Sequence, residues 1–317
     1  MMMTTMTRRL LALQLLAAAS LLLSLLMGST PIHLHQLLYN DYGQFHTVFM
    51  KLRLPRTITA FTSGGLLALS GALIQLLLQN PLADPYVLGI SSGAAFFTLL
   101  LMMCGANGDW LLAGAWFGSL LTAGLVLMLA RRHSWQIHTL LLTGMAIASG
   151  FAAGISLILL LSPDASLHSM LFWLMGDLND ARLSFSSLLI LAAGSALCMV
   201  IAPALNVLGR GEKEARSLGL AIKPYRLMVF LLASLFAAAA VTEAGCIGFV
   251  GLIVPHCARR LFGYQHRLML PATVLIGGSL VVLADTAART LFAPLQIPVG
   301  IVLALLGIPI FISLIRS

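Results

Sequence analysis

Long apolar stretches, separated by short polar or charged segments, recur along the whole chain of 317 residues. A helix needs roughly twenty apolar residues to cross a hydrocarbon core of about 30 Å. Ten stretches reach or approach this length, and they lie near residues 9–28, 57–79, 87–105, 110–130, 138–161, 184–206, 226–241, 245–262, 269–290 and 298–315. The pattern therefore predicts an all-α polytopic membrane protein with about ten transmembrane helices in a single domain, residues 1–317.

The composition supports this class and excludes an ordinary soluble domain. Apolar residues make up 60% of the chain, charged residues only 9%, and the mean hydropathy is +1.00. A soluble domain needs more polar surface than this. Glycine and proline interrupt several stretches, as at Gly64-Gly65 and Gly307-Ile308-Pro309. Membrane bundles tolerate them because small residues let helices approach closely and neighbouring groups satisfy the freed backbone.

The positive charges predict the orientation of the chain in the membrane. With a cytoplasmic N-terminus, 13 of the 18 Lys and Arg residues fall in cytoplasmic segments and 5 fall outside. This bias is the positive-inside pattern, so we expect both termini in the cytoplasm. It also explains the net charge of +8 without a nucleic-acid partner. Arg8 and Arg9 precede the first stretch as in a cleaved signal peptide, but its length favours a retained span.

Three arginines on the external side depart from the charge bias. Arg53 and Arg56 precede the second stretch, and Arg289 ends the ninth. They could anchor helix ends at the interface. They could instead form a basic rim for acidic residues of an external partner, since Arg binds carboxylates through two hydrogen bonds. Asp285 lies four residues before Arg289, so an intrahelical pair is a third possibility.

A short charged segment, from Gly211 to Leu220, lies between two apolar stretches. Glu212 and Glu214 near its start and Arg216 further on suit the dipole of a short helix. Such a segment is either a solvated connection or a surface for a cytoplasmic partner. No G-x-x-x-x-G-K-[ST] phosphate loop occurs in the sequence, so the chain has no usual means of binding ATP itself.

Several motifs occur in order along the chain: Arg53-Leu54-Pro55-Arg56, Gly71 to Gln75, Asn80-Pro81-Leu82-Ala83-Asp84-Pro85, Gly211 to Leu220, Gly245 to Leu252, Pro255-His256, His266-Arg267, Ala284-Asp285 with Ala288-Arg289, Ile297 to Gly300, and Gly307-Ile308-Pro309. In these motifs, and over nearly its whole length, the chain resembles the FecCD-type permease subunits of the importers for iron-siderophores, haem and vitamin B12. These importers are a class of ABC transporter. The resemblance implies the type II ABC importer permease fold.

The resemblance also implies partners, cargo and location. It implies a second permease subunit, identical or paralogous, two cytoplasmic ATPase subunits and a periplasmic substrate-binding protein. The chain would be non-catalytic and bind no cofactor or metal, because the partner ATPase uses ATP and Mg. It would lie among lipids in the bacterial cytoplasmic (inner) membrane. The expected cargo is an iron(III)-siderophore, the commonest in the family, with haem and cobalamin left open.

Site residues follow from the same resemblance. Residues 209–222 would contain cytoplasmic coupling helices, whose ATPase contacts would be Gly211, Glu212, Glu214, Ala215, Arg216, Leu218 and Gly219. The binding protein would dock on Arg53, Arg56 and Arg289. The cytoplasmic gate would consist of Asn80, Leu82, Ile137 and His138. At the last two positions the vitamin B12 permease has small hydroxyl residues instead, so this gate could close differently.

Two other functions are considered, and each needs ionisable or catalytic groups within the spans, where the sequence has few. An ion-coupled secondary transporter of a small organic or metal-chelate substrate needs ionisable groups near the membrane midplane. An intramembrane protease needs a paired nucleophile and base or two carboxylates, and Asp285 is the one deeply placed acid. Glu243 is expected at the outer interface.

Two histidine motifs invite a metal-site interpretation. His256 follows Pro255, and His33 and His35 lie in the first external loop. A metal site needs three or four convergent ligands. Neither motif brings a third ligand, so the sequence favours structural or interfacial histidines.

Overall fold

The structure is a computed structural model that describes residues 2–28, 47–131, 137–179, 181–291 and 293–316. His33 and His35 lie outside these ranges. The described helices are α1 (Met2–Leu26), α4 (Leu54–Leu77), α5 (Ile90–Met103), α6 (Asp109–Arg131), α7 (Ile137–Leu161), α8 (Asp164–Leu174), α9 (Phe185–Leu208), α10 (Glu212–Ser217), α11 (Ile222–Ala244), α12 (Val250–Phe262), α13 (His266–Thr290) and α14 (Val299–Arg316). A π-helical turn, η1 (Phe49–Arg53), precedes α4, and a 3₁₀ turn, η2 (Pro85–Leu88), precedes α5.

The predicted all-α class is confirmed, and each of the ten predicted spans coincides with a helix. Seven helices in the described ranges are long and apolar enough to cross a membrane, and α5 and Val299–Ser313 are shorter apolar helices. The eighth predicted span began too early, because α12 has only 13 residues. Gly245 and Phe249 both have positive φ, at 66° and 69°, so the chain turns before α12 starts.

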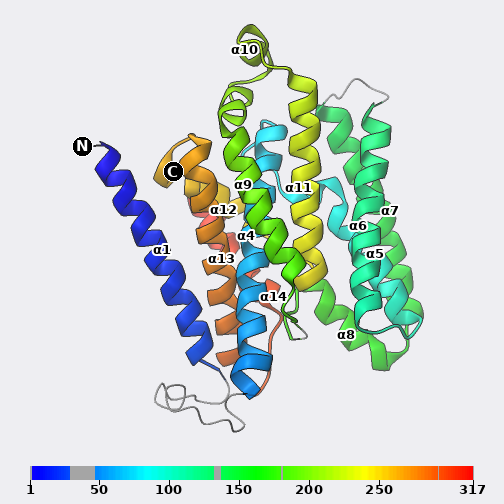
Figure 1. Cartoon of the computed structure of the whole chain (residues 1–317). Helices are drawn as coiled ribbons and strands as arrows, with labels where there is room; N and C mark the ends of the chain where they lie inside the picture. Colours follow the sequence, from blue (N-terminus) through cyan, green and yellow to red (C-terminus); the bar gives the residue numbers. More distant parts are fainter. Residues whose placement is uncertain (1, 29–46, 132–136, 180, 292, 317) are drawn as a thin grey trace.

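Helix α4 occupies the centre of the bundle and packs against α11, α12 and α13 (Figure 1). In the most apolar 18-residue stretch of the span Phe49–Leu77, which contains α4, 89% of the residues are buried. Glycine permits this close packing: a Cβ on Gly64 would collide with the backbone of Gly277 on α13, and one on Gly71 with that of Gly251 on α12. Close backbone approach through small residues is typical of membrane helices, where apolar lipid offers no hydrophobic drive for association.

The two ends of the bundle differ. The short helix α10 lies at the end that also holds the N-terminus, and α8 lies at the opposite end (Figure 1). This arrangement agrees with the predicted orientation, in which both the N-terminus and residues 209–222 are cytoplasmic. The bundle therefore separates the predicted coupling segment from the predicted docking arginines.

Candidate coupling, gating and docking sites

Helix α10 has only six residues, and a glycine lies close to each of its ends, Gly211 before it and Gly219 after it. Gly211 and Gly219 have φ of 101° and 77°, a region that favours glycine. Between them, Ala215 is fully buried in the core, and α10 packs on α9 and α11. Two of the predicted coupling residues, Gly211 and Ala215, thus shape and seat the helix.

The charges of α10 bind it to the bundle. Glu212 accepts hydrogen bonds from Arg216, one turn later, and from Arg226 on α11, the latter at 3.0 Å. The positive charge of Arg226, followed by that of Arg216, lowers the pKa of the Glu212 carboxyl. Glu212 is therefore occupied inside this chain and holds α10 against α11.

The outward surface of α10 is what a partner could reach. Glu214, Arg216, Leu218 and Gly219 are exposed, and 59% of Leu218 is accessible. The Leu220 side chain packs partly against the core, and its N–H donates to the carbonyl of Ala215 at 3.0 Å. Of the apolar residues at this end of the segment, Leu218 is the one left outside.

The segment after α4 forms the turn predicted to contribute to the gate. Gln79 adopts a left-handed conformation, with φ of 51°. Asn80 Oδ1 accepts the N–H of Leu82 at 2.9 Å, and the Asn80 carbonyl accepts that of Ala83 at 3.2 Å. Asn80 and Leu82 are exposed, Leu82 by 50%. Asparagine closes the turn with its own side chain and presents Leu82 outward.

Neighbouring contacts fix the position of this turn. The Asp84 carboxylate caps η2 by accepting the Tyr86 N–H at 2.8 Å, and Tyr86 Oη donates to the Ile247 carbonyl at 2.7 Å. Helix α7 packs on η2 at Gly144. His138 is exposed in the first turn of α7; the side chain of Ile137 lies outside the described residues. Helix α7 thus packs on η2, the 3₁₀ turn that directly follows the segment with Asn80 and Leu82.

The three predicted docking arginines lie at the other end of the bundle, and two of them are buried. Arg53 is 4% exposed and donates to the Leu25 and Leu26 carbonyls at 3.0 and 2.9 Å. Arg289 is 7% exposed, donates to Ser24 Oγ at 2.8 Å and also bonds the Ser24 carbonyl. Both arginines therefore hold the C-terminal end of α1, and little of either side chain is exposed.

Arg56 is the partly accessible member, with 13% of its side chain exposed. It forms an ion pair of 2.8 Å with Asp285 and donates to Asn179 at 2.8 Å and to Gln296 at 3.0 Å. The intrahelical contact between Asp285 and Arg289 is longer, at 3.5 Å. The deep acid is thus neutralised by two arginines, which disfavours a free carboxylate for ion coupling. Docking on the arginines stays a prediction.

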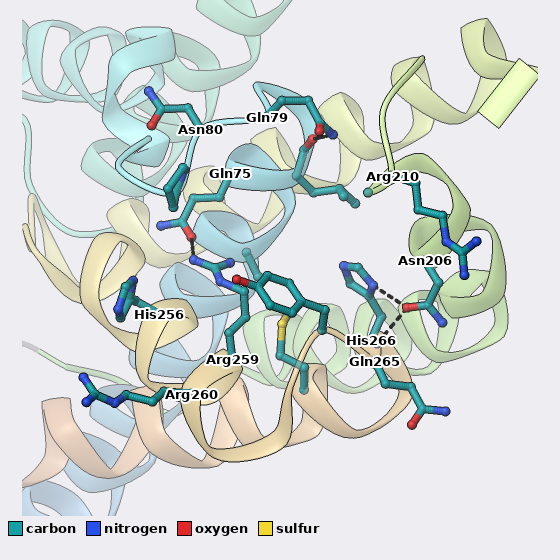
Figure 2. A pocket seen from close by; sticks show the side chains of 16 residues that line it. Gln75, Gln79, Asn80, Asn206, Arg210, His256, Arg259, Arg260, Gln265 and His266 are labelled. Carbon is teal, nitrogen blue, oxygen red and sulfur yellow. Dashed lines mark hydrogen bonds between the residues drawn. The ribbon is translucent and has the colours of Figure 1, made fainter. Parts of the chain in front are cut away.

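The structure also brings together residues that the sequence analysis did not connect. A cavity of about 1040 Å³ lies where α4, α9, α12 and α13 end or begin (Figure 2). Arg210, Arg259 and Arg260 line it together with His256 and His266. The sequence analysis used these arginines only as part of the 13 cytoplasmic Lys and Arg residues that set the orientation. A polar Gln75 within an otherwise apolar span was the signal that could have located the cavity.

Another sequence candidate, Glu243, has a partner within the chain. Ser187 Oγ donates to its carboxylate at 2.8 Å, which joins the end of α11 to the start of α9. The contact gives Glu243 a structural role, and its place at the outer interface stays a prediction.

Comparison with known proteins connects these sites to a family. The FecCD transport family matches residues 15–317. The hemin transport system permease protein HmuU of Yersinia pestis is 40% identical over 277 residues, covering 84% of this chain and 83% of its own. The vitamin B12 import system permease protein BtuC of Shigella boydii is 35% identical over 312 residues, covering 97% and 94%.

A solved structure agrees with the fold. An inward-facing metal-chelate type ABC transporter superposes with a TM-score of 0.86 at 32% identity, covering 98% of this chain and 99% of that one. The predicted type II permease fold is thereby confirmed. Because the family match covers part of the first predicted span and all of the other nine, and the relatives match over most of their length, the chain belongs to the FecCD transport family of ABC importer permeases.

Proposed function

We propose that this chain is the membrane-spanning subunit of an ATP-driven importer that carries a metal chelate into the cytoplasm. An iron(III)-siderophore is the first choice of cargo, with haem or cobalamin as the alternatives. Two relatives are named for the transport of hemin and vitamin B12, and the similar solved structure is that of a metal-chelate type transporter. Both observations support this class of cargo.

Helix α10 carries the proposal. It is a charged helix seated by Ala215 and Glu212, with Glu214 and Leu218 facing outward. The sequence contains no phosphate loop, so energy must come from a separate subunit or from an ion gradient, and an exposed helix such as α10 favours the separate subunit. A short rigid helix at the end of the bundle suits the transfer of motion from an ATPase to the spans.

The remaining parts follow the same scheme. A second permease subunit, identical or paralogous, would complete the translocation path, and two ATPase subunits would bind the two copies of α10. ATP binding would close the ATPases and switch a gate formed by Asn80, Leu82, Ile137 and His138. A periplasmic binding protein would deliver the cargo near Arg56. The chain would lie in the bacterial inner membrane with both termini cytoplasmic.

Reconstitution in proteoliposomes tests the proposal. The chain, its ATPase and its binding protein are combined, and uptake of radiolabelled cargo is measured with the binding protein loaded with iron(III)-siderophore, haem or cobalamin. The expected result is uptake of one chelate that requires ATP and survives collapse of ion gradients by ionophores. Uptake abolished by ionophores and indifferent to ATP would instead support the ion-coupled secondary transporter. Identification of the ligand that copurifies with the binding protein selects the cargo.

A further inference from the structure

The basic cavity at the cytoplasmic end of the bundle has a composition unlike that of the rest of the protein. Three arginines line it, Arg210 at the end of α9 and Arg259 and Arg260 at the end of α12. Among the described residues that line the cavity, none is acidic. Guanidinium groups in a lining that contains no carboxylate produce a positive field that favours an anion, and Arg210 and Arg259 contribute to it.

Neutral hydrogen-bonding groups complete the lining. Arg259 Nη2 donates to the side-chain oxygen of Gln75, so an amide rather than a carboxylate orients this guanidinium (Figure 2). On the other side, Asn206 Oδ1 accepts the backbone N–H of His266 at 2.9 Å and lies 2.7 Å from its Nδ1. These bonds hold the walls in place but add no negative charge. The charge of Arg259 therefore remains available to a ligand.

The size and position of the cavity narrow the class of anion. About 1040 Å³ exceeds the space that a single carboxylate side chain fills and is in the range of pockets that hold whole small molecules. The arginines lie at the ends of spans on the side where the positive-inside pattern places the cytoplasm. Basic pockets between helices at this level bind phosphate-bearing lipid headgroups, and Arg matches phosphate oxygens through paired hydrogen bonds.

We propose that this cavity is a binding site for a phosphate group, carried either by an anionic phospholipid or by a soluble phosphate ester. Arg210 and Arg259 supply the main contacts. The site joins two elements of the proposed mechanism, since Asn80 of the gate turn lines one side and Arg210, beside the start of α10, lines another. A bound phosphate group would hold these elements together. The ligand site is independent of the cargo.

The test measures ligand binding by the full-length chain, not transport, so its failure leaves the proposed function untouched. The purified protein is placed in nanodiscs or micelles, and binding of phosphatidylglycerol is compared with binding of phosphatidylcholine by native mass spectrometry. Inorganic phosphate and ATP serve as soluble probes in a second arm. Arg210→Gln alone and Arg210→Gln with Arg259→Gln are compared with Arg267→Gln. Arg267 is exposed near the cavity but does not line it.

The expected result is selective binding of phosphatidylglycerol, or of a soluble phosphate compound, that weakens at least about tenfold in the double variant. The single Arg210→Gln variant weakens it less, and Arg267→Gln leaves it within about twofold. Lipid-selective binding identifies the lipid source, and binding of phosphate or ATP identifies the soluble source. Equal loss in Arg267→Gln, or no selective binding in any arm, overturns the proposal.

Discussion

The guanidinium of Arg56 forms an ion pair with the fully buried carboxylate of Asp285, which lies 229 positions later in the chain. Its Nε lies 3.0 Å from both carboxylate oxygens, and its Nη2 lies 2.8 Å from one of them. The pair joins α4 to α13 at the end where α1 also docks. An acid that could have marked an ion-coupling site is thereby the counter-ion of a structural arginine cluster.

We expect the Asp285→Asn variant to be strongly destabilised. It leaves Arg56 and Arg289 close together with no carboxylate between them, and loss of one partner of a buried ion pair costs about 3 kcal/mol or more. Thermal unfolding in detergent, followed by intrinsic fluorescence, measures the effect. Asp109→Asn is the matched control, because its pair with Arg182 is exposed, with 88% and 70% of the side chains accessible. Equal midpoints for the two variants would contradict the structural role.

The three predicted docking arginines should differ in how they affect docking and stability. Arg56→Ala should weaken affinity for the binding protein about tenfold at low ionic strength and reduce its dependence on salt, as for a charge at an interface rim. It should also lower thermal stability, because it removes one of the two arginines that neutralise the buried Asp285. Arg53→Ala and Arg289→Ala should chiefly lower thermal stability, because they release the end of α1. Surface plasmon resonance at two salt concentrations, paired with thermal unfolding, separates these effects. If Arg53→Ala weakens docking while its stability is unchanged, the result would support a docking surface formed by all three arginines.

The sequence accounts for the helices better than for the arginines, and the reason is physical. Span length and polarity are local properties, so the apolar runs located the helix of each predicted span but missed the short α8, which is too short to resemble a span. The start of α12 was wrong because positive φ at Phe249 depends on packing. The burial of Arg53 and Arg289 depends on where α1 docks, which no local pattern encodes. The cavity beside Gln75 likewise assembles from the ends of four helices that are distant in sequence.

Coupling should depend on Leu218 more than on the charges of α10. Leu218→Asp places a charge where 59% of an apolar side chain faces outward, and burial of a leucine at an interface contributes about 1.5–3 kcal/mol. We therefore expect affinity for the ATPase to fall at least about tenfold with an unchanged unfolding temperature. Glu212→Lys should instead lower stability, since Glu212 holds Arg226.

The control for the coupling variant is Leu291→Asp. Leu291 is 70% exposed and caps α13 at the end of the bundle opposite α10. Copurification of the ATPase with each variant measures the interaction. If Leu291→Asp and Leu218→Asp retain equal amounts of ATPase, α10 is a solvated connection and the coupling surface lies elsewhere.

The predicted gate is tested best at Leu82. Asn80 closes its own turn by accepting the Leu82 N–H, so a cysteine at position 80 also disturbs the turn, whereas Leu82→Cys keeps this bond. Leu82 is 50% exposed, as expected for a side chain that meets a second subunit. In a background without the four native cysteines, Leu82→Cys should crosslink across the permease dimer when the path is closed toward the cytoplasm. Non-reducing electrophoresis in different nucleotide states measures this.

Two further variants decide whether crosslinking at Leu82 reports a gate or only proximity. His138→Cys, exposed in the first turn of α7, should respond to nucleotide in parallel with Leu82→Cys, because α7 packs on η2 and η2 follows the turn directly in the chain. Ser217→Cys on α10 is exposed on a coupling element and should not crosslink to its counterpart. A gate opens and closes, so its crosslinks must rise in one nucleotide state and fall in another. Crosslinks at Leu82 that are constant in every state, or that occur equally at Ser217, would make this segment a passive turn.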